Sequence, residues 1–581
     1  MNLANTLNTA WMWKCRGELQ AFRRATSAVA ETQATVLAEI VSRNRATVYG
    51  IRHGFDGIRS PGDFQDRVPL STYDTYAELI RRIAQGEANV LTRQRVRLLE
   101  PTSGTTRGEK LIPYTKSLAR QFQRALAAWI ADLMQHCPAV RRGRAYWSIS
   151  PAFGQARKTS GGIPIGFDDD TAYLGRFERF AARRLLVVPP AISTLADIEN
   201  FRYCTLLHLM RADDLSLISV WSPTFLTALL QPLEEWGDRI CHDLRSGSLS
   251  LPVRAHSEVL RQLGPRASVN IRRANQLESI LRSNLSLPEK LRQVWPRLAL
   301  ISCWTDAAAA QYMAEVRRLF PSVEIQPKGL LATEGCVSFP LVGQTGAALA
   351  LRSHFFEFAA VDAASHGQAE PNDCLLAHEL SRGSRYRVIV TTAGGLYRYQ
   401  LHDVVEVVGF EKHCPMLKFV GKADHVSDLV GEKLSEPHVR DVLGRAFSAH
   451  RITPRFSLVV PVAGKPVAGQ LPHYRLYLQG SELVGRPELL NSMASAVQAG
   501  LEENPYYRHA VQLRQLSRLE VCVLDGASEP GWLVYERGCL ARGQKAGDIK
   551  PAALDCRTGW SHEFSRMVAS ANLENPTFRS V

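Results

Sequence analysis

Short β-rich runs alternate with longer helical stretches through the middle of this chain, and this alternation limits the folds open to it. Helical segments of roughly 10 to 40 residues lie between these runs. Strands separated in this way are typical of an α/β protein with mostly parallel strands. The β-rich runs are Ala145–Ile149, Leu185–Val188, Leu215–Val220, Leu298–Ser302, Val323–Gln326 and Tyr386–Thr391.

The pattern changes after Gly409, and a smaller region of mixed helices and strands follows. A chain of 581 residues exceeds the size at which one hydrophobic core keeps growing, so we expect two or more domains. We expect a large N-terminal domain over residues 1–421, a hinge over 422–433 and a small, mobile α+β lobe over 434–581. The lobe's expected elements are helices at Glu436–Phe447 and Pro487–Glu502 and strands at Phe456–Val462, His473–Leu478 and Leu519–Leu524.

Amphipathic helices are expected in two places nearer the N-terminus. Residues Trp11–Arg52 carry a helical stripe of apolar side chains that Thr26 and Gln33 interrupt, which indicates a packing helix. A second amphipathic helix is expected over Leu118–Met134.

The segment before that second helix, Thr102–Lys110, has the composition of a phosphate-binding loop. Glycines bring backbone N–H groups close to an anion, hydroxyls add donors, and lysine adds a mobile positive charge. The spacing of a Walker A loop is absent, and an ordinary Ser/Thr/Gly-rich loop is the alternative. The candidate nucleotide-binding residues are Ser103, Gly104, Thr105, Thr106 and Lys110.

A Thr-Glu pair between glycines follows the run Val323–Gln326. Thr333 could place a hydroxyl on a phosphate, and Glu334 could place a carboxylate on Mg²⁺, which prefers oxygen ligands. The alternative is a helix N-cap with a glutamate in the first turn.

Two further segments carry candidate residues. Asp403 ends a polar turn before a new apolar strand and could accept both hydroxyls of a ribose, the alternative being a surface turn of an edge hairpin. His402 is an acid/base candidate by type only, and we do not assign it a catalytic role. The segment Gly421–Leu434, which includes Lys422 and Asp424, joins the two regions as a hinge or as an ordinary interdomain loop.

Composition excludes several classes of protein. The net charge is +14, but the basic residues are dispersed and form no run of five, so nucleic-acid binding is not the expected function. No apolar run approaches the ~20 residues needed to span a bilayer. The eleven cysteines form no Cys-x-x-Cys pair, which argues against zinc and a disulfide framework and favours a reducing compartment, the cytoplasm.

Taken in order, the four segments resemble those of the acyl-acid amido synthetases of plants and bacteria, the auxin-responsive GH3 family of the adenylate-forming superfamily. The family's Tyr-Arg-x-Gly-Asp motif corresponds to Tyr399–Asp403, with Gln400 in place of Arg and His402 in place of Gly. Leu330 stands where an aromatic is expected before Glu334. The resemblance also includes Tyr49–Phe55, Ser160–Gly166, Val220–Pro223, Cys303–Thr305, Phe355–Phe358 and Asp548–Pro551.

This resemblance implies roles for the candidate residues. Thr333 would contact the α-phosphate of ATP, Glu334 would hold Mg²⁺, and Asp403 would bind the ribose. Lys550, delivered by the C-terminal lobe, would stabilise the adenylation transition state, with Lys433 as a weaker second candidate. Ser103, Thr105 and Thr106 would hold phosphates, and Lys422 and Asp424 would lie at the hinge.

The implied reaction has two steps: a carboxylic acid becomes an acyl-adenylate with release of pyrophosphate, and an amine, that of an amino acid, then takes the acyl group. The implied cofactors are ATP and Mg²⁺, and the partners are these small molecules, with no nucleic acid and no membrane; a monomer is compatible with the sequence. An acyl-CoA ligase using the same adenylate, or a catalytically silent nucleotide-binding protein, are the alternatives.

Overall fold

The computed structural model describes residues 3–102, 110–148, 157–166, 181, 184–195, 197–254, 269–361, 374–422, 426–463, 471–483, 485–525, 529–544 and 549–567. The chain divides into two compact units. The first contains Met1–Thr305 and Glu315–Phe419, and the second contains Asp306–Ala314 and Val420–Val581.

The first unit holds a four-stranded parallel sheet in the order β3-β6-β7-β8. All five residues of β6 are buried, as expected for a parallel strand covered on both faces. The α/β class predicted from sequence is therefore confirmed. The strands are β3 (Arg144–Trp147), β6 (Leu215–Ser219), β7 (Leu300–Cys303) and β8 (Glu324–Pro327), and the helices between them are α9 (Ile198–Arg211), α10 (Pro223–Leu230), α11 (Leu233–Ser246), α13 (Ile271–Leu281), α14 (Leu287–Val294) and α15 (Met313–Leu319).

A second, seven-stranded sheet of this unit has the order β12-β11-β13-β14-β15-β10-β9, and its strand pairs are antiparallel where their register is defined. The expectation of mostly parallel strands thus describes the four-stranded sheet and not this one. Only two residues join β14 to β15, and so short a connection suits antiparallel neighbours. The strands are β9 (Ser338–Pro340), β10 (Ala347–Leu349), β11 (Phe355–Ala360), β12 (Cys374–Leu376), β13 (Arg385–Thr391), β14 (Tyr399–Glu411) and β15 (Cys414–Lys422).

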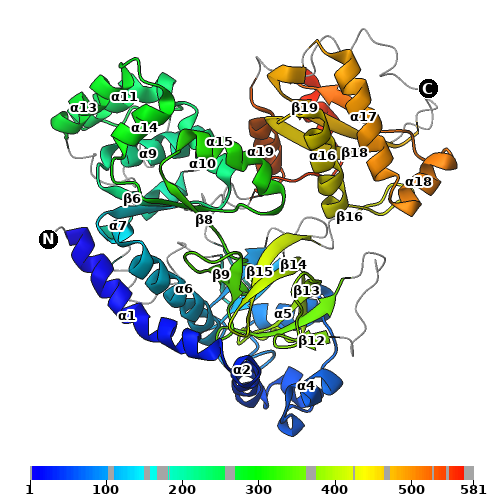
Figure 1. The fold of residues 1–581 in the computed structure, drawn as a ribbon. Helices are drawn as coiled ribbons and strands as arrows, with labels where there is room; N and C mark the ends of the chain where they lie inside the picture. The colour runs from blue at the N-terminus through cyan, green and yellow to red at the C-terminus, as the bar shows by residue number, and fades with distance from the viewer. Residues whose placement is uncertain are drawn as a thin grey trace. The chain divides into compact units, whose positions relative to one another are not determined.

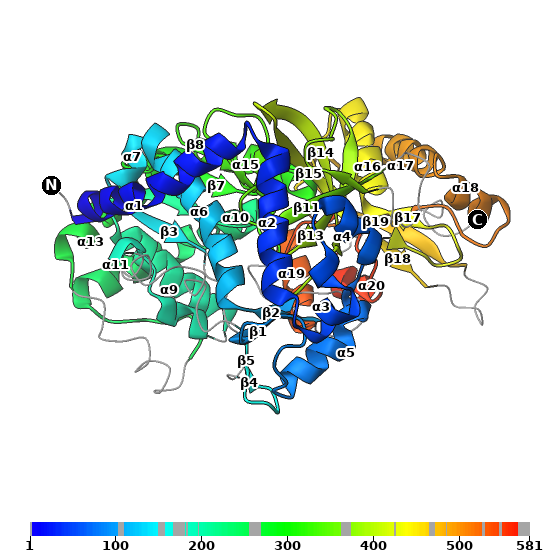
Figure 2. The ribbon, with the colours of Figure 1, turned by 90° about the horizontal axis from the view of Figure 1, so that it is seen from below.

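The N-terminal region forms three helices where the sequence predicted one: α1 (Leu3–Ala25), α2 (Val29–Asn44) and α3 (Val48–Arg52). The break falls at buried Thr26, whose hydroxyl donates to the carbonyl of Arg23 and ends α1. Helix α1 runs beside α6 (Lys116–His136) in both views (Figures 1 and 2).

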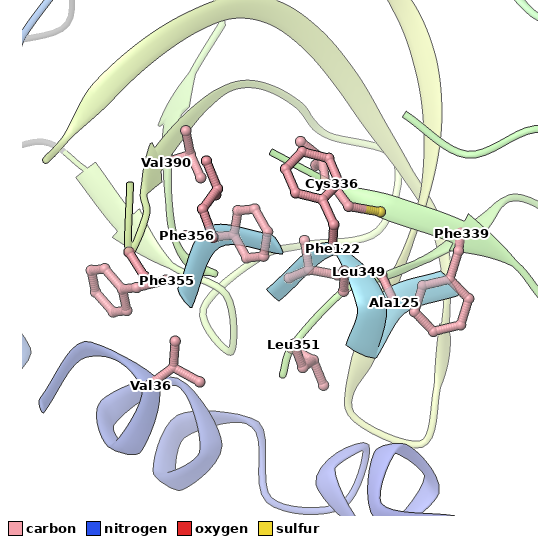
Figure 3. Close-up of a cluster of buried hydrophobic side chains, with 14 of the residues drawn as sticks. Val36, Phe122, Ala125, Cys336, Phe339, Leu349, Leu351, Phe355, Phe356 and Val390 are labelled. Carbon is pink, nitrogen blue, oxygen red and sulfur yellow. The ribbon is translucent and has the colours of Figure 1, made fainter. Parts of the chain in front are cut away.

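Apolar side chains of α2 and α6 meet the seven-stranded sheet in the main core of the first unit. Val36 on α2 and Phe122 on α6 lie in one buried cluster with Phe355 and Phe356 of β11 (Figure 3). Gln33 interrupts the apolar stripe because its amide donates to the carbonyls of Leu351 and His354, and so fixes α2 at the start of β11.

A small mixed sheet, β2-β1-β5-β4, completes the first unit. Strands β1 (Leu98–Thr102) and β2 (Lys110–Tyr114) form an antiparallel hairpin, and β1 also pairs with β5 (Pro164–Ile165), which pairs with β4 (Arg157–Lys158). The short helices of this unit are η1 (Phe55–Gly57), α4 (Pro61–Arg67), α5 (Tyr73–Ala84), α7 (Pro138–Arg141) and η3 (Pro190–Thr194).

The second unit has its own core around a three-stranded sheet, β18-β19-β20, against which α16 and α17 pack. It includes η4 (Ala307–Tyr312), and the Tyr312 ring lies 6.0 Å from that of Trp532. Its other elements are β16 (Val426–Ser427), β17 (Leu434–Ser435), α16 (Glu436–His450), β18 (Phe456–Val462), β19 (His473–Gln479), η6 (Ser481–Leu483), α17 (Pro487–Leu501), α18 (Pro505–Gln512), β20 (Glu520–Val523), α19 (Gly531–Ala541), α20 (Trp560–Phe564) and η8 (Ser565–Met567). Among the described residues of both units, no helix is long and apolar enough to cross a membrane.

Candidate active site

The carboxyl ends of β6, β7 and β8 meet at one edge of the parallel sheet, the usual place for ligands in open α/β sheets. Ser219, Ser302 and Gln326 stand in register on these three strands. Neighbours in register on parallel strands share a face, so we call these three residues the polar row. The Ser302 hydroxyl is buried and has no hydrogen-bond partner within the described part of the chain.

Helix α6 covers the polar row. The indole N–H of Trp129, in this helix, donates to Oε1 of Gln326 at 2.9 Å. Lys328 lies two positions beyond Gln326 and its Nζ donates to the Ser219 hydroxyl at 2.8 Å. The ammonium lies 4.9 Å from the ring centroid of Trp221 and 5.7 Å from that of Trp129, within cation–π range.

Desolvation lowers the pKa of Lys328 to about 8, and the charge of the nearby Cys303 thiolate would oppose this shift. Burial in turn raises the pKa of Cys303 to about 11, so the thiol is neutral at pH 8. Sequence reasoning missed Lys328. Its position just past a strand was the available signal, but its aromatic neighbours come from distant segments.

Thr333 and Glu334 lie in a tight turn after β8. Ala332 and Gly335 exchange two backbone hydrogen bonds across this turn, and Leu331 forms an antiparallel β-bridge with Cys336. The helix N-cap considered as an alternative for the Thr-Glu pair is not formed. Both side chains are partly exposed.

Strand β2 holds the turn from one side. The Tyr114 hydroxyl donates to the main-chain carbonyl of Thr333 at 2.8 Å. Lys110 begins the same strand, and its Nζ lies 5.9 Å from the ring centroid of Tyr73. Lys110 and Tyr114, the residue that contacts the Thr-Glu turn, therefore belong to one strand. The predicted phosphate-loop residues Ser103, Gly104, Thr105 and Thr106 lie outside the described residues.

Buried His354 holds the turn from the other side. Its Nε2 accepts from the backbone N–H of Cys336 at 3.1 Å, so its Nδ1 carries the proton and donates to Oε1 of Gln121 on α6 at 3.1 Å. Burial lowers the pKa of His354 to about 3 and keeps the imidazole neutral. A Cβ on Gly335 would lie 3.0 Å from Nε2, so glycine permits this close approach.

Asp403 lies inside strand β14 and is buried, so the predicted polar turn between two strands is wrong. The register of β13 and β14 shifts at this point: Arg387 pairs with Val404, but Ile389 pairs with Gln400. His402 lies in this bulge with φ = 61°, a left-handed conformation. That conformation favours glycine, the residue that the family motif has there.

The remaining candidates belong to the second unit or its border. Lys422 is the last residue of β15. Lys550 is exposed and follows buried Ile549. Lys433 lies 3.7 Å from Asp428 and has φ = 45°. Asp424 lies outside the described residues.

The donor set near the turn suits a cation that is held mainly by phosphates. Among the described residues, no group of three or more His, Cys, Asp or Glu side chains could hold a metal ion. Mg²⁺ usually takes only one or two protein carboxylates and completes its coordination with phosphates and water. Glu334, partly exposed in its turn, fits that mode.

Comparison with protein families matches the GH3 family N-terminal domain to residues 18–325 and the GH3 family central domain to residues 347–422. The probable indole-3-acetic acid-amido synthetase GH3.11 of Oryza sativa subsp. japonica is 25% identical over 547 residues, covering 89% of this chain and 90% of that protein. The indole-3-acetic acid-amido synthetase GH3.15 of Arabidopsis thaliana is 28% identical over 440 residues, covering 71% of each.

The fold is also that of a solved relative. The structure of the GH3.15 acyl acid amido synthetase superposes with a TM-score of 0.78 at 22% identity and covers 95% of this chain and 96% of that one. Its complex with 2,4-DB superposes with a TM-score of 0.80 at 21% identity, covering 96% of each.

Proposed function

The chain belongs to the GH3 family, and we propose on that basis that it is an ATP-dependent acyl-acid amido synthetase. The carboxylate of an acid attacks the α-phosphate of ATP and yields an acyl-adenylate and pyrophosphate. The amine of an amino acid then attacks the acyl carbon, and an amide and AMP are released. All eleven cysteines are free, which supports a cytoplasmic site for this reaction.

One observation in this chain supports the proposal most directly. The Thr333–Glu334 turn follows the carboxyl end of a parallel strand and is tied through Tyr114 to the hairpin that carries Lys110. Lys110 and Thr333 are 223 positions apart in the sequence. Strand β2 connects them, because Lys110 begins it and Tyr114, which contacts Thr333, ends it.

Each candidate has a proposed role. Thr333 would donate its hydroxyl to the α-phosphate, and Lys110 would offset phosphate charge. Glu334 would hold Mg²⁺, which when bound lowers the cost of charge developing on the phosphates. Asp403 would accept the ribose hydroxyls, and Lys422 would lie at a hinge. Lys550 would stabilise the adenylation transition state by its charge. Ser103, Gly104, Thr105 and Thr106 would bind phosphates.

Acid-dependent exchange of labelled pyrophosphate into ATP tests the first step. We expect exchange with at least one acid of a panel of aromatic and aliphatic carboxylic acids, and an amide product when amino acids are added. A folded sample that binds ATP but exchanges with no acid would contradict the proposal. A thioester formed with CoA in place of an amide would assign the chain to acyl-CoA ligases instead.

A further inference from the structure

Lys328 has neighbours that attract a cation but do not neutralise it. Within the described part of the chain its partners are the Ser219 hydroxyl and the rings of Trp129 and Trp221, and no carboxylate pairs with it. A desolvated ammonium without a counter-ion is costly. A chain that holds one in place therefore gains if an anion binds there.

We propose that Lys328 binds the carboxylate of the acyl acid before adenylation, an inference that rests on the proposed function. The ammonium lies at the carboxyl edge of the parallel sheet, just before the Thr333–Glu334 turn. An acid held at this edge would have its carboxylate bound by Lys328, in the same loop that carries Thr333, the proposed α-phosphate contact.

Aromatic surfaces beside Lys328 define the class of acid. Trp221 and Trp304 follow β6 and β7, and their ring centroids lie 5.6 Å apart. The backbone N–H of Trp304 donates to the carbonyl of Trp221 at 2.8 Å, which fixes the two segments together. Both residues are partly exposed, so their indole surfaces can contact a ligand. The inferred substrate is a monocarboxylate with an aromatic or other planar apolar body.

The geometry also favours the acid over the other two substrates. A phosphate needs several donors, whereas the ammonium here is flanked by two indoles and one hydroxyl. An amino-acid acceptor carries an ammonium beside its carboxylate, and repulsion between that ammonium and Lys328 offsets the attraction of the carboxylate; the acyl acid brings a carboxylate alone.

The pH dependence of acid binding should follow Lys328. Among the titratable groups of the strands beside it, Cys303 of β7 interacts electrostatically with Lys328. The charge of Arg317 on α15 in turn lowers the pKa of Cys303. Cys303 is neutral below pH 10 and arginine stays charged, so neither changes charge near pH 8. Because only protonated Lys328 pairs with a carboxylate, affinity for the acid should be constant below pH 8. It should fall about tenfold per pH unit well above it.

The test is Lys328→Met in the full-length protein, with benzoate, phenylacetate and indole-3-acetate as probes in pyrophosphate exchange. We expect the KM for the best wild-type acid to rise about tenfold or more, with the KM for ATP unchanged. Lys328→Arg should recover most of the loss. Lys290→Met is the matched control, since Lys290 also makes one hydrogen bond, to the Leu281 carbonyl, but lies on α14.

The outcomes separate this inference from the proposed function. If the wild type shows exchange and Lys328→Met has an unchanged KM for the acid, the role of Lys328 is overturned and the synthetase proposal stands. A higher KM for ATP or for the amino acid alone also overturns it. Absence of exchange in the wild type with every acid overturns both. If Lys328→Met loses thermal stability, Lys328→Gln and direct titration of the acid without ATP decide the question.

Discussion

His402 shows how one residue can depart from a motif and keep its backbone conformation. Its φ of 61° places a side chain in the left-handed region, within the bulge that positions Asp403. For a residue other than glycine this region costs roughly 1–2 kcal/mol. The family's glycine would adopt it without that cost.

We therefore expect His402→Gly to be more stable than His402→Ala by about 1 kcal/mol, because both remove the side chain and only glycine relieves the backbone. Urea unfolding of the two variants measures the difference. Gln400, which pairs regularly with Ile389, is the control position. There Gly should be less stable than Ala by roughly 0.5–1 kcal/mol. An equal order at both positions would contradict the strained bulge.

Residue identity alone predicted only part of the site. Thr333 and Glu334 stand out in the sequence because glycines flank them, and the structure places them in an accessible turn. Lys328 has no such signature, since its properties depend on Trp129 and Trp221, which lie 199 and 107 positions earlier. Only the assembled sheet and α6 bring these residues together.

Secondary-structure elements meet at His354, which ties the Thr333–Glu334 turn to α6. The imidazole bridges Cys336 and Gln121, and Oε1 of Gln121 also accepts from the backbone N–H of Ala393 at 2.9 Å. His354 and Gln121 together thus connect the loop after β8, helix α6 and the segment between β13 and β14. Protonating this histidine would break its hydrogen bond from Cys336.

Acid should therefore destabilise the first unit through His354. Its folded-state pKa of about 3 lies below the unfolded value of ~6.5, so its contribution to stability is complete above pH 6.5. That contribution falls by about 1.4 kcal/mol per pH unit as pH drops toward 3. The unfolding free energy, measured at pH 7, 6 and 5, should decline less in His354→Gln than in the wild type. Near pH 5 the difference in slope should correspond to nearly one proton taken up on unfolding. Parallel pH profiles would show that His354 titrates normally.

Element boundaries were predicted well where an apolar period was unbroken. The expected strand Phe456–Val462 has those bounds, and the helix expected at Leu118–Met134 lies within α6. The single helix over Trp11–Arg52 was wrong because α1 ends at Ala25, where the hydroxyl of buried Thr26 donates to the Arg23 carbonyl, a local bond that the apolar period does not report. Strand direction in the seven-stranded sheet depends on connections that local periodicity does not report.

At the scale of the whole molecule, each of the two units consists of two separate segments of the chain. Residues Asp306–Ala314 cluster with the second unit, although they stand between β7 and β8 in the chain. The proposed hinge over 422–433 contains a segment that is already fixed to the second unit. Glu432 accepts from the backbone N–H groups of Leu429 and Val430 and from the Tyr474 hydroxyl on β19.

If the second unit moves between the two half-reactions, Leu429 and Val430 should therefore move with it. Lys550 also belongs to the second unit and would move with it. The segment that follows it is anchored there: the backbone N–H of Ala553 donates to Glu436 at 3.3 Å, and Leu554 bridges Val459 of β18.

Lys550→Ala separates the two half-reactions. If Lys550 acts only on the charge that develops during adenylation, the variant should slow acid-dependent pyrophosphate exchange by about a hundredfold or more. With pre-formed acyl-adenylate and an amino acid it should still make the amide near the wild-type rate. Single-turnover assays of each step measure this, with Lys290→Met as a surface control. Equal loss in both steps would indicate damage to the fold of the second unit. Unchanged rates would make Lys550 a solvated surface residue. Only a selective loss of adenylation supports its assigned role.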